Sequence, residues 1–182
     1  MALVFLECDI QKAFETSILN FDAVKVQAAK MAQIAHIFNL PLISTLQTPK
    51  NFGQVHPDIA NHHPTSVFKA TKTLFSMLTP EVKAKLSELK RPKVVVYGIE
   101  AHICVYQTCL DLIEDGSYEV FLLYEGVSSN SFLDRNIALK KLQALGVNML
   151  SLEALPPLLG RMNTIQKTNL DRVLQFKPQL PL

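Results

Sequence analysis

The sequence predicts a three-layer α/β/α sandwich, in which helices cover both faces of a central, mostly parallel six-stranded sheet. Two observations carry this prediction. Strand-like and helix-like segments alternate along the whole chain, with crossovers long enough to connect parallel strands, and the most apolar strand shows no alternation of polar residues. The chain has 182 residues, of which 48% are hydrophobic, and no repeat or linker divides it. We therefore expect a single domain over residues 1–182.

The first part of the chain is expected to contain three strands and one long helix. Leu3–Glu7 is a short apolar run, which is typical of a strand. Apolar residues recur at helical spacing from Asn20 to Asn39, and strand-forming residues return at Leu40–Leu46 and Thr65–Thr71. Between these two strands, Gln47–Pro64 lacks periodicity and is rich in Pro, Asn and His, which predicts a long functional loop.

The central part begins with a helix whose start is clearly marked. Thr79 precedes Pro80, so that an N-cap and a first-turn proline predict a helix that runs to about Leu89. Lys93–Tyr97 is the most apolar strand, and a helix is expected from about His102 to Asp115, where Gly116 ends it.

The last part repeats the same alternation. Short apolar runs predict strands at Glu119–Tyr124 and Val147–Leu150, on either side of a helix at Ser131–Leu145. A further helix is expected at Leu152–Leu159. The polar tail from about Arg161 to Phe176 is expected to be a surface helix or an oligomer contact.

Composition narrows the possible partners and the compartment. The formal net charge is only +2, with Lys and Arg scattered along the chain, which gives no reason to expect nucleic acid or an acidic membrane. The three cysteines, Cys8, Cys104 and Cys109, have no paired spacing and are predicted to be free thiols in a reducing compartment. No apolar run approaches the roughly 20 residues of a membrane span, and no glycine-rich phosphate loop is present. We expect a cytoplasmic protein without a cofactor.

Several polar residues directly follow strands, at the edge where open parallel sheets bind ligands. They are Asp9, Gln11, Thr45, Gln47, Lys72, Glu100, His102, Cys104, Glu125, Ser128 and Ser129. Taken singly, Lys72 suits a solvated surface and Cys104 suits a small buried position. Together with Asp9 they place an acid, a base and a thiol on one rim.

These three residues allow a coherent chemistry. A thiol in the first turn of a helix has a lowered pKa and becomes a good nucleophile, which would suit Cys104. Asp9 could take and return its proton, and Lys72 could keep Asp9 ionised or stabilise developing negative charge. Phe14 and Phe75 are expected to line the pocket wall or pack below it, whereas Cys8 should point to the opposite face of its strand, into the core.

Three segments, FLECDIQKAF, TKTLFSM and VVVYGIEAHICVYQTCLDL, carry a family resemblance in their order and spacing. From about Leu3 to Leu159 the chain resembles the isochorismatase-like cysteine hydrolases, especially the isochorismatase-domain-containing branch. The resemblance implies a catalytic triad of Asp9, Lys72 and Cys104. It also implies a cis peptide bond between Ile99 and Glu100, with the N–H groups of Glu100 and Cys104 as oxyanion donors.

The sequence departs from relatives of the nicotinamidase type, which place an Asp-x-His metal motif after the second strand. Here Gln47-Thr48-Pro49 stands at that place. A metal site built from His56, His62 and His63 stays open, but a solvated loop is the preferred interpretation. Some similar proteins carry a ribonuclease name. This sequence does not support that activity, because it has no basic stripe, no catalytic histidine pair and no interleaved aromatic residues.

The leading hypothesis is a metal-independent cysteine hydrolase that acts on a small amide, ester or related molecule through a thioester. Gln11, Phe14, Gln47, Phe75 and His102 are the expected pocket residues, although His102 equally suits a solvent-bonded helix start. A non-catalytic oligomeric scaffold or binding protein is the competing class, and a flavodoxin-like nucleotide binder is the least favoured. The resemblance also implies a homo-oligomer.

Overall fold

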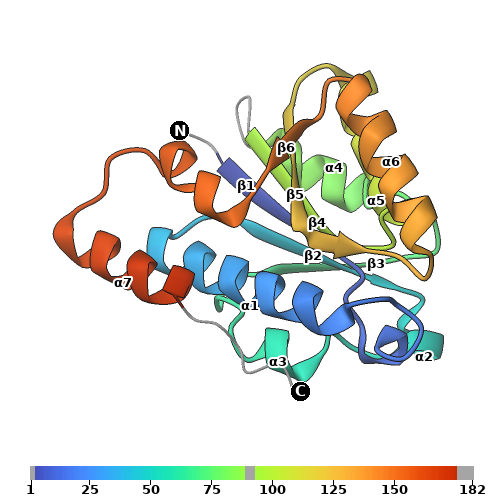
Figure 1. Ribbon diagram of the computed structural model, residues 1–182, viewed down its shortest axis with the longest axis horizontal. Helices are drawn as coiled ribbons and strands as arrows, with labels where there is room; N and C mark the ends of the chain where they lie inside the picture. Colours follow the sequence, from blue (N-terminus) through green and yellow to red (C-terminus); the bar gives the residue numbers. More distant parts are fainter. Residues whose placement is uncertain (1–2, 89–92, 176–182) are drawn as a thin grey trace.

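The computed structural model describes residues 3–88 and 93–175, and its centre is a six-stranded sheet in the order β3-β2-β1-β4-β5-β6 (Figure 1). Every pair of neighbouring strands is parallel. The strands are β1 (Leu3–Cys8), β2 (Leu42–Gln47), β3 (Phe68–Lys72), β4 (Lys93–Ile99), β5 (Glu119–Ser128) and β6 (Asn148–Leu150). The strand order reverses between β1 and β4, and such a switch point opens a crevice at the carboxyl ends of the strands.

Helices cover both faces of the sheet, which confirms the predicted three layers (Figure 1). One face is covered by α1, with α3 and α7 packed against it, and the other by α4, α5 and α6. The main helices are α1 (Phe21–Phe38), α4 (Pro80–Ser87), α5 (Cys104–Asp115), α6 (Phe132–Ala144) and α7 (Thr164–Gln175). The short ones are η1 (Lys12–Phe14), α2 (Pro49–Phe52), α3 (Pro57–Ala60), η2 (Leu152–Ala154) and η3 (Pro156–Leu159). No helix in the described ranges is long and apolar enough to cross a membrane.

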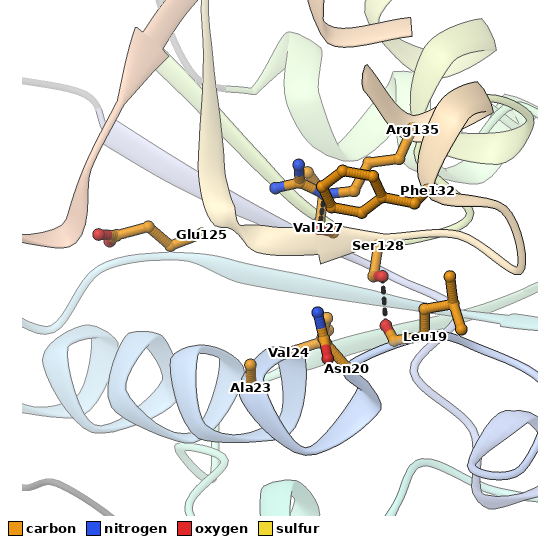
Figure 2. A pocket seen from close by; sticks show the side chains of 9 residues that line it. All are labelled: Leu19, Asn20, Ala23, Val24, Glu125, Val127, Ser128, Phe132 and Arg135. Carbon is orange, nitrogen blue, oxygen red and sulfur yellow. Dashed lines mark hydrogen bonds between the residues drawn. The ribbon is translucent and has the colours of Figure 1, made fainter. Parts of the chain in front are cut away.

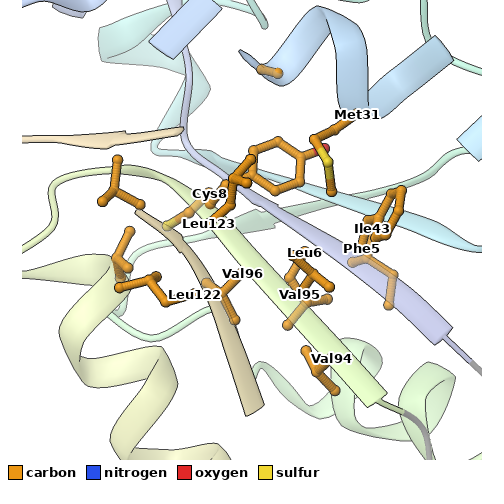
Figure 3. Packing of buried hydrophobic residues seen from close by; sticks show 14 of the residues in the cluster. Phe5, Leu6, Cys8, Met31, Ile43, Val94, Val95, Val96, Leu122 and Leu123 are labelled. Atoms are coloured by element: carbon orange, nitrogen blue, oxygen red, sulfur yellow. The ribbon is translucent and has the colours of Figure 1, made fainter. Parts of the chain in front are cut away.

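The hydrophobic core lies on both faces of the two central strands. All six residues of β1 and all but the first residue of β4 are buried, as the unbroken apolar run of β4 predicts. Figure 3 shows how Phe5 and Leu6 of β1, Val94 to Val96 of β4 and Met31 of α1 gather around these strands. This packing fixes the ends of β1 and β4 relative to each other.

The structure confirms two of the helix ends that were predicted from capping residues. The Thr79 hydroxyl accepts a hydrogen bond from the Val82 N–H at the start of α4. Gly116 ends α5 with a φ of 72°, in the left-handed region. The expected end of the α4 helix, Leu89, and the expected end of the tail helix, Phe176, lie outside the described residues.

Three expected elements differ in the structure. The long loop after β2 contains two one-turn helices, α2 and α3, both of which begin with a proline. The helix expected at Leu152–Leu159 is two short 3-10 turns, because Pro156 and Pro157 interrupt a regular hydrogen-bonded helix. Strand β5 continues to Ser128, past a register shift against β4, so its carboxyl end reaches the same edge as β1 and β4.

Candidate active site

A pocket of about 220 Å³ opens where β1 and β4 end, at the switch point of the sheet. Asp9 follows β1 directly, and Cys104 is the first residue of α5 after β4. The residues that line the pocket are Asp9, Phe14, Gln47, Phe52, Phe75, Ile99, Glu100, Ile103 and Cys104. The carboxylate and the thiol singled out in the sequence therefore share one cavity.

Asp9 and Lys72 form a buried ion pair beside this cavity. Lys72 Nζ lies 2.6 Å from Asp9 Oδ2, and the two side chains are 0% and 2% exposed. The Thr45 hydroxyl donates a hydrogen bond of 2.8 Å to the other carboxylate oxygen, Asp9 Oδ1. The pair forms because β2 and β3 bring Thr45 and Lys72 to the same edge of the sheet as the end of β1.

The ammonium group of Lys72 has further oxygen partners. It donates hydrogen bonds to Gln47 Oε1 at 2.7 Å, to the Phe75 carbonyl at 2.9 Å and to the Leu74 carbonyl at 3.1 Å. Burial lowers the pKa of Lys72, but the negative charges of Asp9 and Cys104 and the hydrogen bond with Asp9 outweigh this effect, and the pKa is raised overall. Lys72 is thus a fixed positive charge that faces Asp9.

Cys104 is 9% exposed and lies in the first turn of α5, where unpaired backbone N–H groups favour a thiolate. A hydrogen bond with Cys8 lowers the pKa of the Cys104 thiol. Burial and the charge of Asp9 oppose this effect, while the charge of Lys72 supports it, and the pKa is lowered overall. Cys104 has the environment of a reactive thiol.

Cys8 lies in the hydrophobic core, as predicted, but the prediction that it points to the face opposite Asp9 is wrong. Its thiol is fully buried and donates to Asp9 Oδ2, with a sulfur–oxygen distance of 3.5 Å. The alternation of a strand no longer holds at Asp9, whose φ of 53° is left-handed, so neighbouring side chains meet. Burial and the hydrogen bond with Cys104 raise the pKa of Cys8 well above its usual range, which keeps this thiol protonated.

The chain between β4 and α5 forms the floor of the pocket. Gly98 has a φ of 121°, and a Cβ atom there would lie 2.1 Å from the carbonyl oxygen of Cys8, so only glycine fits. The Ile99–Glu100 peptide bond is cis. Within the described residues, neither the Glu100 N–H nor the Cys104 N–H donates to another protein group.

The remaining expected pocket residues divide into two groups. Phe14, Gln47 and Phe75 line the cavity. Gln11 lies behind its wall instead, where its amide group bonds to the backbone N–H and C=O of Gln47 and to the carbonyl of Gly53. His102 is also outside the lining, and its Nδ1 lies 2.9 Å from the Ser129 hydroxyl.

Two lining residues, Phe52 and Ile103, were not anticipated from the sequence. Phe52 ends the one-turn helix α2, and its ring stacks on Phe14 with centroids 4.8 Å apart. Phe14 and Phe52 lie in two separate irregular segments, one after β1 and one after β2. Neither segment has a periodic signal, so the sequence does not indicate that the two rings meet.

The expectation of a solvated loop is wrong for His56 and His63. His56 is buried, caps α3 by accepting from the Asp58 N–H, and lies 3.3 Å from a carboxylate oxygen of Glu15. His63 Nε2 lies 3.0 Å from a carboxylate oxygen of the fully buried Glu7. These two histidines are structural, and the described residues contain no group of three or more His, Cys, Asp and Glu that could hold a metal ion.

A second cavity, of about 230 Å³, lies between the start of α1, the end of β5 and α6 (Figure 2). Two of its polar side chains, those of Ser128 and Arg135, are occupied by internal hydrogen bonds. The Ser128 hydroxyl donates to the Leu19 carbonyl, and Arg135 donates to the carbonyls of Val127 and Tyr124. Because its lining does not place a free nucleophile beside an acid or a base, this cavity is a weaker candidate for catalysis.

Comparisons with known proteins show what the chain is similar to. The sequence matches the isochorismatase domain over residues 2–154. It is 35% identical over 187 aligned positions to isochorismatase family protein 1A from Dictyostelium discoideum, which covers 100% of this chain and 85% of that protein. The structure of MAR1 ribonuclease from Caenorhabditis elegans is similar, with a TM-score of 0.86, 29% identity, and coverage of 98% of this chain and 94% of that one.

A more distant structure shares the fold. The YcaC gene product from Escherichia coli, described as an octameric hydrolase of unknown specificity, gives a TM-score of 0.80 at 20% identity. The match covers 94% of this chain and 85% of that one.

Proposed function

The chain belongs to the isochorismatase family, and from this premise we propose that it is a metal-independent cysteine hydrolase of small amides or esters. Cys104 is the nucleophile, Asp9 the general base and acid, and Lys72 the positive charge that is ion-paired with Asp9. The observation that carries the proposal is the Asp9 carboxylate, which is ion-paired with Lys72 and lines the same pocket as the Cys104 thiol.

The first half of the reaction forms a thioester. Asp9 accepts the proton of Cys104 as the sulfur attacks the substrate carbonyl carbon. The oxygen becomes negatively charged, and the unpaired N–H groups of Glu100 and Cys104 supply the donors for it. The C–N or C–O bond then breaks, and Asp9 returns its proton to the leaving amine or alcohol.

The second half releases the acyl group. With the leaving group gone, Asp9 takes a proton from a water molecule that attacks the thioester carbon. The C–S bond breaks, the proton returns to the sulfur, and the carboxylic acid leaves. Lys72 takes no proton in this scheme, because its bonds to Asp9, Gln47 and two carbonyls hold it as an ammonium ion.

The test uses an activated ester, p-nitrophenyl acetate, followed by intact-mass measurement of the acetylated protein. Wild type should acetylate at Cys104 and turn over, Cys104→Ala should do neither, and Asp9→Asn should be slower by about 10²-fold or more. Cys109→Ala, which removes another fully buried thiol, is the matched control and should behave as wild type. Turnover by Cys104→Ala at the wild-type rate would refute the proposal, and an unmodified Cys104 would favour the non-catalytic scaffold.

A ribonuclease activity is not proposed for this chain, although its relative from Caenorhabditis elegans bears that name. No lysine or arginine is among the residues that line the pocket, and both charged residues that do, Asp9 and Glu100, are acids. Phosphodiester substrates need positive charge at the site.

We further propose a homo-oligomer in the reducing cytoplasm. Three apolar side chains of α6 are exposed, namely Phe132, Leu133 and Ile137, and the three cysteines are free. Analytical ultracentrifugation of wild type beside a triple variant, Phe132→Ser/Leu133→Ser/Ile137→Ser, should show loss of assembly, and a wild type that sediments as a monomer would refute it.

A further inference from the structure

The charged residues in the lining of the active-site pocket are all acidic. Its lining contains Asp9 and Glu100 as the charged residues, and no lysine or arginine. Since a pocket recognises a carboxylate mainly through a positively charged side chain, the choice of substrate depends on whether any nearby cation can reach into the cavity.

Lys72 cannot serve that purpose. Its ammonium group carries three N–H donors and lies within 2.6–3.1 Å of four oxygens, those of Asp9, Gln47, Leu74 and Phe75. The side chain is 0% exposed. Every donor is therefore occupied by a protein oxygen, and a substrate carboxylate would have to displace one of them inside a buried site, where an unpaired polar group is costly.

Glu100 leaves an acidic charge at the pocket without a fixed counter-charge. Its Oε2 accepts a hydrogen bond of 2.9 Å from the Asn130 N–H, and its side chain is 21% exposed. The nearest basic group within the described residues is His102 Nδ1 at 3.9 Å, which is charged only if protonated and lies closer to the Ser129 hydroxyl. An anionic substrate would be repelled at short range.

The other walls are apolar. The stacked rings of Phe14 and Phe52 form one side, Ile99 and Ile103 lie in the lining beside Cys104, and Phe75 is 62% exposed. The volume of about 220 Å³ is below the roughly 300–1,000 Å³ of pockets for drug-sized ligands. Both size and surface suit a small apolar group.

We propose that this site selects small, uncharged, apolar acyl groups and rejects acyl groups that carry a carboxylate. The inference rests on the proposed role of Cys104 as the nucleophile, because the acyl group meets the pocket when it is bonded to that sulfur. Dicarboxylates such as isochorismate fall in the rejected class.

The test compares two alkylating agents of nearly equal size, iodoacetamide, which is neutral, and iodoacetate, which is an anion. In both, the thiolate displaces iodide, so that a C–S bond replaces the C–I bond. Second-order rates at Cys104 are measured by peptide mass spectrometry, with N-acetylcysteine amide as the reference thiol at the same pH and ionic strength. The ratio of the neutral rate to the anionic rate should be at least tenfold larger for Cys104 than for the reference.

A pair of variants isolates the charge of Glu100. Glu100→Gln should lower the ratio severalfold towards the reference value. Glu114→Gln removes an exposed carboxylate that lies ten residues after Cys104 along α5, about 15 Å from it, and should leave the ratio unchanged. A Cys104 ratio equal to that of the reference would overturn the selection against anions while the proposed hydrolase stands. Labelling of Cys104 no faster than that of Cys109 would overturn both.

Discussion

Replacing Cys8 by alanine should make the thiol of Cys104, the proposed nucleophile, less acidic. In wild type the hydrogen bond with Cys8 lowers the pKa of Cys104, so the thiolate exists at lower pH than for an ordinary thiol. A hydrogen bond to a charged group contributes about 1.5 kcal/mol, so its loss is large enough to move a titration measurably. In Cys8→Ala the pH midpoint of Cys104 alkylation by iodoacetamide should therefore rise, measured from pH 5 to 10 by intact mass.

Two further variants distinguish this hydrogen bond from a general loosening of the core. Cys8→Ser keeps a donor at the same place and should retain most of the wild-type midpoint. Cys109→Ala removes a fully buried thiol whose pKa of about 12 reflects burial alone, and its Cys104 midpoint should equal that of wild type. An unchanged midpoint in Cys8→Ala, or an equal rise in Cys8→Ser, would refute the reasoning.

Three other variants test the supports of the site by urea unfolding. Lys72→Met leaves the buried carboxylate of Asp9 unpaired and should lower the free energy of unfolding by about 3–5 kcal/mol. Combining it with Asp9→Asn should restore part of the loss, and a loss below about 1 kcal/mol would contradict the ion pair's role. Thr45→Val removes the hydrogen-bond donor to Asp9 Oδ1 and should lower the free energy of unfolding by about 1–3 kcal/mol. An unchanged urea midpoint would contradict a stabilising role of this hydrogen bond. Gly98→Ala places a Cβ atom 2.1 Å from the Cys8 carbonyl oxygen at a positive φ and should prevent folding, so a soluble variant with wild-type stability would contradict the close approach.

The parts of the site that depend on parallel topology were accessible from the sequence. The carboxyl ends of parallel strands meet at one edge, so residues that follow strands could be grouped before any geometry was known. Asp9, Lys72 and Cys104 follow or end β1, β3 and β4, and the structure brings them together. This grouping needed only the parallel topology of the sheet; the distances come from the structure.

The parts that depend on irregular backbone were not accessible. Cys8 was assigned to the wrong face because strand alternation was extended to Asp9, which adopts a left-handed conformation. Gln11 and His63 were placed towards ligand or solvent because the loop after β2 has no periodicity. In the fold the loop instead bonds to Gln11 and brings His63 onto the buried Glu7.

The contacts at the end of β1 both assemble the proposed catalytic site and hold the strand in register. Three consecutive buried residues, Glu7, Cys8 and Asp9, carry ionisable groups. Glu7 is matched by His63 on one side of the sheet, and Asp9 by Lys72 at its edge. A slip of β1 by one residue would turn these side chains to opposite faces and leave two carboxylates buried without partners. Any activity lost in an Asp9 or Lys72 variant must therefore be compared with its unfolding free energy, since the same contacts assemble the site and fix the strand register.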